Sequence, residues 1–298
     1  AIRRQRQMCI RDRLKMGRTQ LQDAVPMTLG QTFHGFASVL RGEVDNLDHA
    51  AQEFLSINMG AAAIGTGICA EPGYAERCTA AIREITGWDV TLAEDLVGAT
   101  SDTVCMVGYS SAMKRIPSKM NKICNDLRLL SSGPRCGLGE FNLPARQPGS
   151  SIMPGKVNPT QCEAVTMVAV QVMGNDTTIG FAASQGNFQL NVFLPVTIYN
   201  FLQSARLLAD VMDSFEANCV RGIRPNYDAI QAHLDASLML VTALNPHIGY
   251  ENAARIAKHA HATGQTLKAA AVELGLLTAE EFDAWVRPEN MVHPKQED

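Results

Sequence analysis

The chain has 298 residues, of which 46% are hydrophobic and 19% are charged, and its formal net charge is −4. These proportions are ordinary for a globular protein, and the slightly acidic balance gives no electrostatic reason to expect nucleic acid as a partner. No uninterrupted apolar run approaches the roughly 20 residues that a membrane-spanning helix requires. We therefore expect neither nucleic acid nor a membrane as a partner.

The eight cysteines are scattered, without a Cys-x-x-Cys pair or a spacing typical of metal ligands. Several lie beside apolar residues in helical patterns, where a reduced cysteine behaves as a small hydrophobic side chain. This usage predicts a reducing, cytoplasmic setting. We expect no metal and no cofactor.

Residues 1–13 are rich in arginine and poor in apolar residues. The stretch Met8 to Arg13 matches the translation of a sequencing-transposon end. Our hypothesis is that residues 1–13 are a non-native leader of a truncated reading frame, so they are left out of the fold prediction. On this hypothesis the native segment that precedes Leu14 is missing.

The first predicted helix runs from about Leu29 to Met59, after an irregular entry that Pro26, Thr28 and Gly30 indicate. Apolar residues at three- and four-residue spacing predict its buried stripe: Val39, Leu40, Val44, Leu47, Ala51 and Leu55. The small residues from Gly60 to Gly67 lack the Gly-Lys-Ser/Thr ending of a phosphate-binding loop. They predict a tight turn and close approach of two chain segments instead.

A short helix is predicted over 72–86, and the strongest periodic signal follows it. Six apolar residues repeat at spacings of three and four, which is typical of a helix packed lengthwise in a bundle: Met113, Ile116, Met120, Ile123, Leu127 and Leu130. Pro117 lies inside this helix and is expected to kink it or remove one backbone hydrogen bond. The helix is expected to end at 131–134.

Two further long helices are predicted over about 161–181 and 190–217, the second interrupted by Pro195. Apolar residues cover nearly every face of the second helix, which predicts that other helices surround it in a bundle shared between subunits. Shorter, more polar helices are predicted over 227–245, 250–263, 266–274 and 278–286. Strand signals are almost absent. We therefore predict an all-α fold, with a central long-helix bundle over 14–221 and a small C-terminal helical domain over 222–298.

The stretch Gly149 to Pro159 (GSSIMPGKVNP) carries the strongest functional signal. Its two glycines and two prolines exclude a regular helix or strand. It nevertheless contains two hydroxyls, one ammonium and one carboxamide. A loop with a special backbone and this density of chemical groups is typical of a binding or catalytic loop.

The groups in this loop suit the removal of a proton next to a carboxylate. A serine hydroxyl such as that of Ser150 is a poor base unless backbone N–H groups and a nearby cation stabilise its alkoxide. Lys156 is such a cation, and Ser151 and Asn158 can donate hydrogen bonds to a substrate carboxylate. The charge released by proton removal would move onto the carboxylate oxygens, giving an aci-carboxylate that Lys156 can hold.

The loop resembles the signature loop of the fumarase/aspartase superfamily, and the resemblance extends over residues 14–294. It implies that Ser150 removes the β-proton of a dicarboxylic acid, with Lys156 and Glu163 supporting the catalytic site. It also implies a homotetramer in which three subunits form each active site. The substrate contacts that it implies are Thr19, Gln20, Ser151, Lys156, the backbone of Val157, and Asn158.

The leaving group is the open question in this resemblance. Residues 17–26, 58–67 and 93–96 resemble aspartase, whereas residues 159–164, 184–191 and 245–250 are more like class II fumarase. Fumarases carry a histidine at the position of Gln20, and a glutamine cannot supply a proton to departing hydroxide. We therefore predict an aspartate ammonia-lyase that converts L-aspartate to fumarate. The alternatives are a class II fumarate hydratase, acting on fumarate and L-malate, and a non-catalytic bundle fragment.

Overall fold

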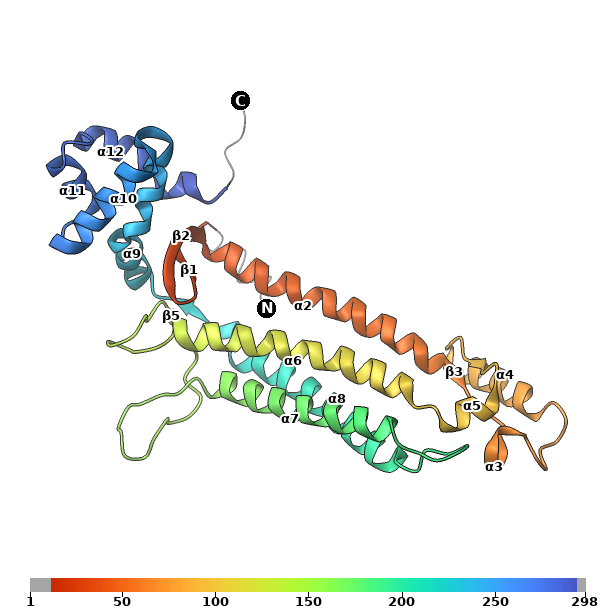
Figure 1. The fold of residues 1–298 in the computed structure, drawn as a ribbon. Helices are drawn as coiled ribbons and strands as arrows, with labels where there is room; N and C mark the ends of the chain where they lie inside the picture. Colours follow the sequence, from red (N-terminus) through yellow and green to blue (C-terminus); the bar gives the residue numbers. More distant parts are fainter. Residues whose placement is uncertain (1–11, 294–298) are drawn as a thin grey trace. The chain divides into compact units, whose positions relative to one another are not determined.

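The computed structural model describes residues 12–293, and this part of the chain is all-α, as predicted. Figure 1 shows its helices. In chain order these are α2 (Leu29–Ala51), α3 (Ala62–Gly65), α4 (Tyr74–Thr86), α5 (Leu96–Ser101), α6 (Val104–Leu130), α7 (Thr160–Ala183), α8 (Leu194–Asn218), α9 (Tyr227–Ala236), α10 (Asn245–Thr263), α11 (Leu267–Glu273) and α12 (Ala279–Trp285). Four 3₁₀-helices span Gln52–Leu55, Val220–Gly222, Leu238–Leu244 and Pro288–Met291. None of these helices is both long and apolar enough to span a bilayer.

The described residues divide into two compact units that are each discontinuous in sequence. One unit contains 12–37, 129–144 and 220–293, and the other contains 38–128 and 145–219. The predicted division into 14–221 and 222–298 stays a prediction. The hypothesis of a leader concerns residues 1–13, almost all of which lie outside the described residues.

In the first unit, the expected irregular entry before α2 is wrong. Residues 14–28 form an antiparallel hairpin of β1 (Leu14–Thr19) and β2 (Gln22–Thr28). Proline is tolerated at position 26 because a two-stranded sheet leaves one edge of each strand without ladder hydrogen bonds. At Gly17 a Cβ would lie 2.7 Å from the carbonyl oxygen of Val25, so the absence of a side chain permits the pairing.

Met16 anchors this hairpin in the core formed by the C-terminal helices. It is completely buried and belongs to the same hydrophobic cluster as Leu244, Ile256 and Ala270. The helix predicted over 227–245 is shorter than expected, because α9 ends at Ala236 and a 3₁₀-helix follows. The predicted N-terminus of the last helix is confirmed, since Thr278 and Glu281 form a reciprocal capping box at the start of α12.

The second unit is built around α6, α7 and α8, which run side by side in Figure 1. The apolar repeat of α6 is confirmed, because Met113, Met120, Ile123 and Leu127 are at most 3% exposed. Met113 packs against Val172 of α7 and Leu208 of α8. These residues form the core of the unit.

Two predictions concern prolines in the long helices. Pro117 is buried inside α6, and the helix continues through it as one element. The predicted interruption at Pro195 is wrong, because α8 begins at Leu194 and Pro195 lies in its first turn. A proline there removes only an N–H that would have no partner within the helix.

The buried stripe predicted on α2 is wrong at two residues, since Val39 and Val44 are 45% and 58% exposed. Glu43 takes the inward position and is only 1% exposed. It forms ion pairs with Arg115 (2.8 Å between Nε and Oε2) and with Lys119, both on α6. Burial acts to raise the pKa of the Glu43 carboxyl, but these two cations outweigh it and hold the pKa below its ordinary value. A prediction from apolar spacing assigns a glutamate to the surface. It therefore places the Glu43 side of α2 in solvent, although this side is buried.

Four short strands complete the described secondary structure. The strands β3 (Ser56–Ile57) and β4 (Thr91–Leu92) pair in parallel. The strands β5 (Phe141–Asn142) and β6 (Arg224–Pro225) pair antiparallel. The pairing of β5 with β6 holds the chain a few residues before the 149–159 loop.

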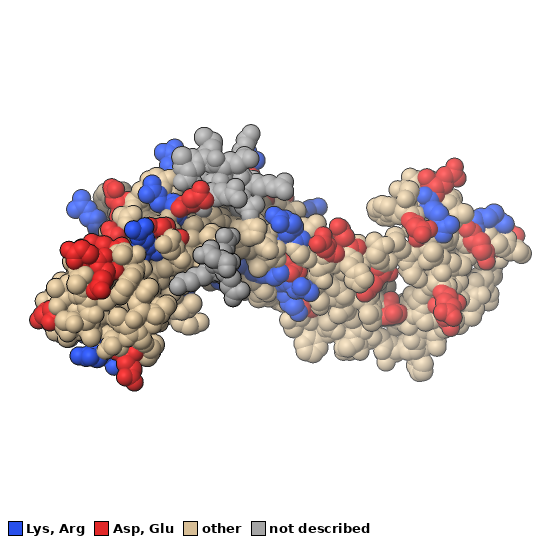
Figure 2. Space-filling model, turned by 90° about the horizontal axis from the view of Figure 1, so that it is seen from above, with Lys and Arg blue, Asp and Glu red and all other residues tan. Residues whose placement is uncertain are grey.

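The charged surface matches the composition. On the face shown in Figure 2, Lys and Arg residues are interspersed with Asp and Glu, and uncharged residues form most of the surface. The described residues on this face form no continuous basic stripe of the kind that follows a nucleic-acid backbone.

Candidate functional site

The stretch between β5 and α7 is a loop, as its glycines and prolines predicted. A hydrogen bond of 2.6 Å from the backbone N–H of Gly149 to the carbonyl oxygen of Lys156 closes it at its base. A Cβ at Gly149 would lie 2.7 Å from Oδ1 of Asn158, so only glycine allows this close approach. Gly155 has a φ of +79°, in the left-handed region that favours glycine. The two glycines thus set the shape of the loop.

Side chains at both ends of this loop bind the C-terminal end of α8. The guanidinium of Arg146 donates from Nε to the carbonyl oxygen of Asn218 over 2.7 Å. On the other side, the hydroxyl of Ser214 donates to Oε1 of Gln161 over 2.9 Å. A cation at a helix C-terminus also interacts favourably with the helix dipole. The two ends of the loop are therefore held by one rigid helix.

Three thiols lie beneath the end of the loop. Cys124 and Cys162 are completely buried and Cys219 is 2% exposed. The neighbouring Cys124 thiol and burial raise the pKa of Cys162 to about 12, and Cys162 and burial raise the pKa of Cys219. Cys162 and Cys219 therefore stay protonated at neutral pH, and all three buried thiols pack as small hydrophobic side chains, as predicted.

The predicted loop residues are accessible to a ligand. Ser150 is half-buried, and its Oγ accepts a hydrogen bond of 3.3 Å from the backbone N–H of Ile152. Ser151, Lys156 and Val157 are exposed, and Asn158 is half-buried. Their polar groups are available for an anionic ligand.

Glu163 lies in the first turn of α7, five residues beyond Asn158. Within residues 12–293 the side chains of Lys156 and Glu163 make no hydrogen bond or ion pair with each other or with Ser150. The three predicted catalytic groups thus share one loop–helix segment without contacting each other. No ion pair among these three side chains competes with a bound substrate.

Thr19 and Gln20 lie at the tip of the β1–β2 hairpin and are exposed. Gln20 and Leu21 form the two-residue turn between Thr19 and Gln22, with φ values of 50° and 65°. Such turns match the twist of a hairpin but strain residues other than glycine, asparagine and aspartate. Thr19 and Gln20 belong to the first compact unit, whereas the loop belongs to the second.

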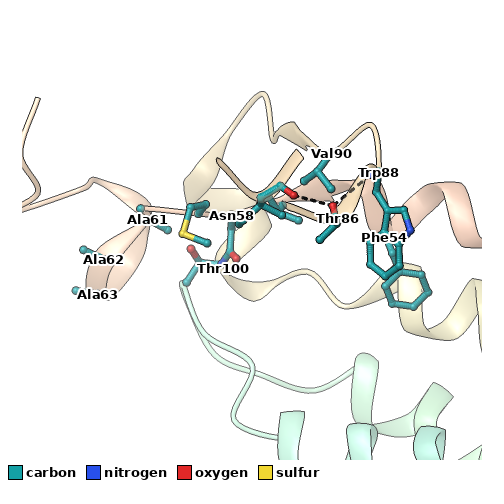
Figure 3. Close-up of a pocket in the computed structure, with 13 residues that line it drawn as sticks. Phe54, Asn58, Ala61, Ala62, Ala63, Thr86, Trp88, Val90 and Thr100 are labelled. Atoms are coloured by element: carbon teal, nitrogen blue, oxygen red, sulfur yellow. Dashed lines mark hydrogen bonds between the residues drawn. The ribbon is translucent and has the colours of Figure 1, made fainter. Parts of the chain in front are cut away.

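A cavity of about 640 Å³ lies elsewhere in the second unit. Figure 3 shows its lining residues: Phe54, Ile57, Asn58, Met59, Gly60, Ala61, Ala62, Ala63, Ile82, Thr86, Trp88, Val90 and Thr100. In Figure 1, α3, α4 and α5 lie at the end of α7 opposite to the one where the 149–159 loop joins it. No predicted site residue lines this cavity.

The first four residues of the small-residue run 60–67 line this cavity, and the close approach predicted for the run is confirmed. A Cβ at Gly65 would lie 2.4 Å from the Cα of Val97. Ala62 and Ala63 have φ values of 36° and 47°, which are strained for residues with a Cβ.

No group of three or more His, Cys, Asp or Glu side chains is placed to hold a metal ion in the described part of the chain. The expected absence of a metal and a cofactor stays a prediction.

Comparison with known proteins supplies the family. A family model described as "Lyase" matches residues 3–174, and one described as "Fumarase C C-terminus" matches residues 240–293. The first match covers more than half of the chain and begins inside the segment 1–13. The chain belongs to the fumarase/aspartase superfamily of lyases.

Its relatives are named more narrowly. The chain is 55% identical over 282 residues to the class II fumarate hydratase of Thermosynechococcus vestitus, covering 95% of this chain and 60% of the relative. It is 54% identical to the class II fumarate hydratase of Helicobacter pylori, covering 95% and 61%. The crystal structure of the class II fumarase of Schistosoma mansoni superposes with a TM-score of 0.92 at 39% identity, covering 96% and 63%. The chain thus spans about three fifths of the length of the curated relatives it matches.

The names of these relatives contradict the prediction of an aspartate ammonia-lyase. The prediction relied on Gln20 and on the aspartase-like residues 17–26, 58–67 and 93–96, but relatives at 52–55% identity over most of the chain are fumarate hydratases. A single side chain at the tip of an exposed turn does not outweigh similarity over the whole chain. The reading of the chain as an enzyme for L-aspartate is therefore wrong.

Proposed function

We propose that the protein containing this chain is a class II fumarate hydratase, which interconverts fumarate and L-malate. The observation that carries the proposal is the 52–55% identity to relatives of that name. The loop supports the proposal. A backbone hydrogen bond closes its base, its polar side chains are accessible, and Ser150, Lys156 and Asn158 suit proton removal next to a carboxylate.

In the direction from malate to fumarate, Ser150 removes the proton from the carbon next to one carboxylate. The electron pair moves onto that carboxylate, and the resulting aci-carboxylate is held by Lys156 and by N–H groups of the loop. Collapse of this intermediate expels hydroxide from the neighbouring carbon and forms the double bond of fumarate. The hydroxide takes up the proton that Ser150 removed and leaves as water. Ser151, Asn158 and the backbone of Val157 bind the carboxylates. Thr19 also contacts the substrate, in a site that different subunits of the proposed assembly form together. Glu163 supports the loop from the first turn of α7.

The hydratase is tested by following fumarate absorbance, starting from L-malate, from L-aspartate and from fumarate. We expect turnover of malate and hydration of fumarate, and no turnover of aspartate. Faster turnover of aspartate would contradict the hydratase. Absence of all turnover in a folded protein would favour a non-catalytic bundle.

Gln20 provides a prediction about pH. A glutamine amide can bind a carboxylate or a water molecule but does not titrate, whereas a histidine titrates near pH 6.5. Gln20→His is therefore expected to add an inflection near that pH to the profile of kcat for fumarate hydration. The parallel variant Gln20→Asn should keep the original profile. Identical pH profiles for Gln20→His and the parent protein would show that residue 20 does not take part in the reaction.

We also propose that the protein assembles as a homotetramer. The exposed apolar side chains of α7 and α8 support this proposal, since Met167, Val170, Tyr199 and Leu202 are between 57% and 69% exposed. Apolar surface concentrated on two long neighbouring helices is typical of an assembly interface. Light scattering of the protein in solution measures the assembly mass, and a monomeric mass would contradict the tetramer.

A further inference from the structure

A fully buried carboxylate lies next to the strand that carries the Thr19–Gln20 turn. Glu140 precedes β5 and is 0% exposed. Its Oε1 lies 2.7 Å from Nη1 of Arg18 and 3.1 Å from Nδ1 of His233 on α9, and its Oε2 lies 3.7 Å from Nζ of Lys15. Lys15 is itself only 4% exposed. All four residues belong to the first compact unit.

Such a cluster is poorly explained as a source of stability. Removing charged groups from water costs several kcal/mol each, so a buried ion pair is often no more stabilising than apolar residues of the same volume. A buried ionic cluster does fix the geometry of its residues, because each charge must keep its partners. The cluster therefore indicates that the neighbouring chain segment must be held in one position.

The element that needs positioning is the turn. A two-stranded hairpin is at best marginally stable by itself. This hairpin also has positive φ at Gln20 and Leu21, neither of which is a glycine. Arg18 directly precedes Thr19, and its Nε lies 3.6 Å from Oδ1 of Asp23 on the opposite strand. The guanidinium thus links the buried Glu140 to both strands beside the turn.

We propose that Glu140 is a positioning residue for substrate binding, which acts through Arg18 and Lys15 to hold the Thr19–Gln20 turn in its binding conformation. This inference rests on the proposed function, in which Thr19 and Gln20 contact the dicarboxylate. His233 completes the arrangement by joining α9 to the same carboxylate oxygen as Arg18.

The test is the variant Glu140→Gln, which keeps the size of the side chain but removes its charge. Glu43→Gln is the matched control, since Glu43 of α2 is also almost completely buried and pairs with two cations, both on α6 in the second unit. In the fumarate hydration assay, Glu140→Gln is expected to raise KM by roughly tenfold to a hundredfold, the size of effect that misplacement of a positioning group produces. The change in kcat is expected to be much smaller. Glu43→Gln should leave KM unchanged, even if the melting temperature of this variant is lower than that of the parent protein.

Hydrogen exchange of the turn tests the inference independently of catalysis. The backbone amides of residues 19–23 are expected to exchange faster in Glu140→Gln than in the parent protein, and at the parent rate in Glu43→Gln. This measurement applies even if the parent protein hydrates no fumarate, an outcome that would contradict the proposed function alone. If Glu140→Gln does not fold, His233→Ala, which removes a half-buried partner, should show the same changes to a smaller degree. A folded Glu140→Gln or His233→Ala protein with parental exchange in the turn and a parental KM would overturn the inference.

Discussion

Replacement of Ser150 by alanine is expected to lower the turnover of L-malate by about a thousandfold or more, as removal of a catalytic base does in other enzymes. The half-buried hydroxyl lies at the start of the loop. Alanine removes it together with the 3.3 Å hydrogen bond from the backbone N–H of Ile152, but it keeps the Gly149–Lys156 backbone bond at the base of the loop. The measurement is kcat from fumarate absorbance, with circular dichroism to confirm the fold.

Ser151→Ala is the control for this prediction. Ser151 is an exposed neighbour in the same loop and is proposed to bind substrate. Its loss should mainly raise KM. Nearly normal kcat in Ser150→Ala, or an equal loss of kcat in both variants, would show that Ser150 is not the base.

The second large effect is expected for Gly149→Ala. The added Cβ would lie 2.7 Å from Oδ1 and 2.9 Å from the backbone nitrogen of Asn158, so the base of the loop must open. We expect roughly a hundredfold loss of kcat/KM, because a displacement of about 1 Å in a binding group has an effect of that size. The melting temperature should change little, because the loop is largely exposed.

Gly155→Ala is the matched variant for this position. It has the same chemistry in the same loop, but its added Cβ meets no atom within 4 Å and strains only the backbone. Its effect should be smaller than that of Gly149→Ala. Hydrogen exchange of residues 149–158 with and without a dicarboxylate measures loop closure directly. We expect protection on binding in the parent protein, and a weaker protection in Gly149→Ala. Equal activity of the two variants would mean that the contact with Asn158 is unimportant.

Much of the fold and of the candidate loop followed from local pattern. The heptad spacing of Met113, Met120 and Leu127 placed α6 correctly, because apolar periodicity records which face of a helix is buried. The capping box at Thr278 and the loop at 149–159 were equally predictable. Each depends on the chemistry of residues within a few positions of each other.

The hairpin at residues 14–28 and the buried face of α2 could not be predicted in this way. Met16 is buried because helices more than 200 residues later in the chain enclose it. Glu43 faces inward because Arg115 and Lys119, on a different helix, supply the opposite charges. The cluster around Glu140 is of the same kind. The partners of its carboxylate are residues 15, 18 and 233, so no spacing along the chain marks it. A buried charge is tolerated only where distant partners converge on it, and that convergence exists only in the folded chain.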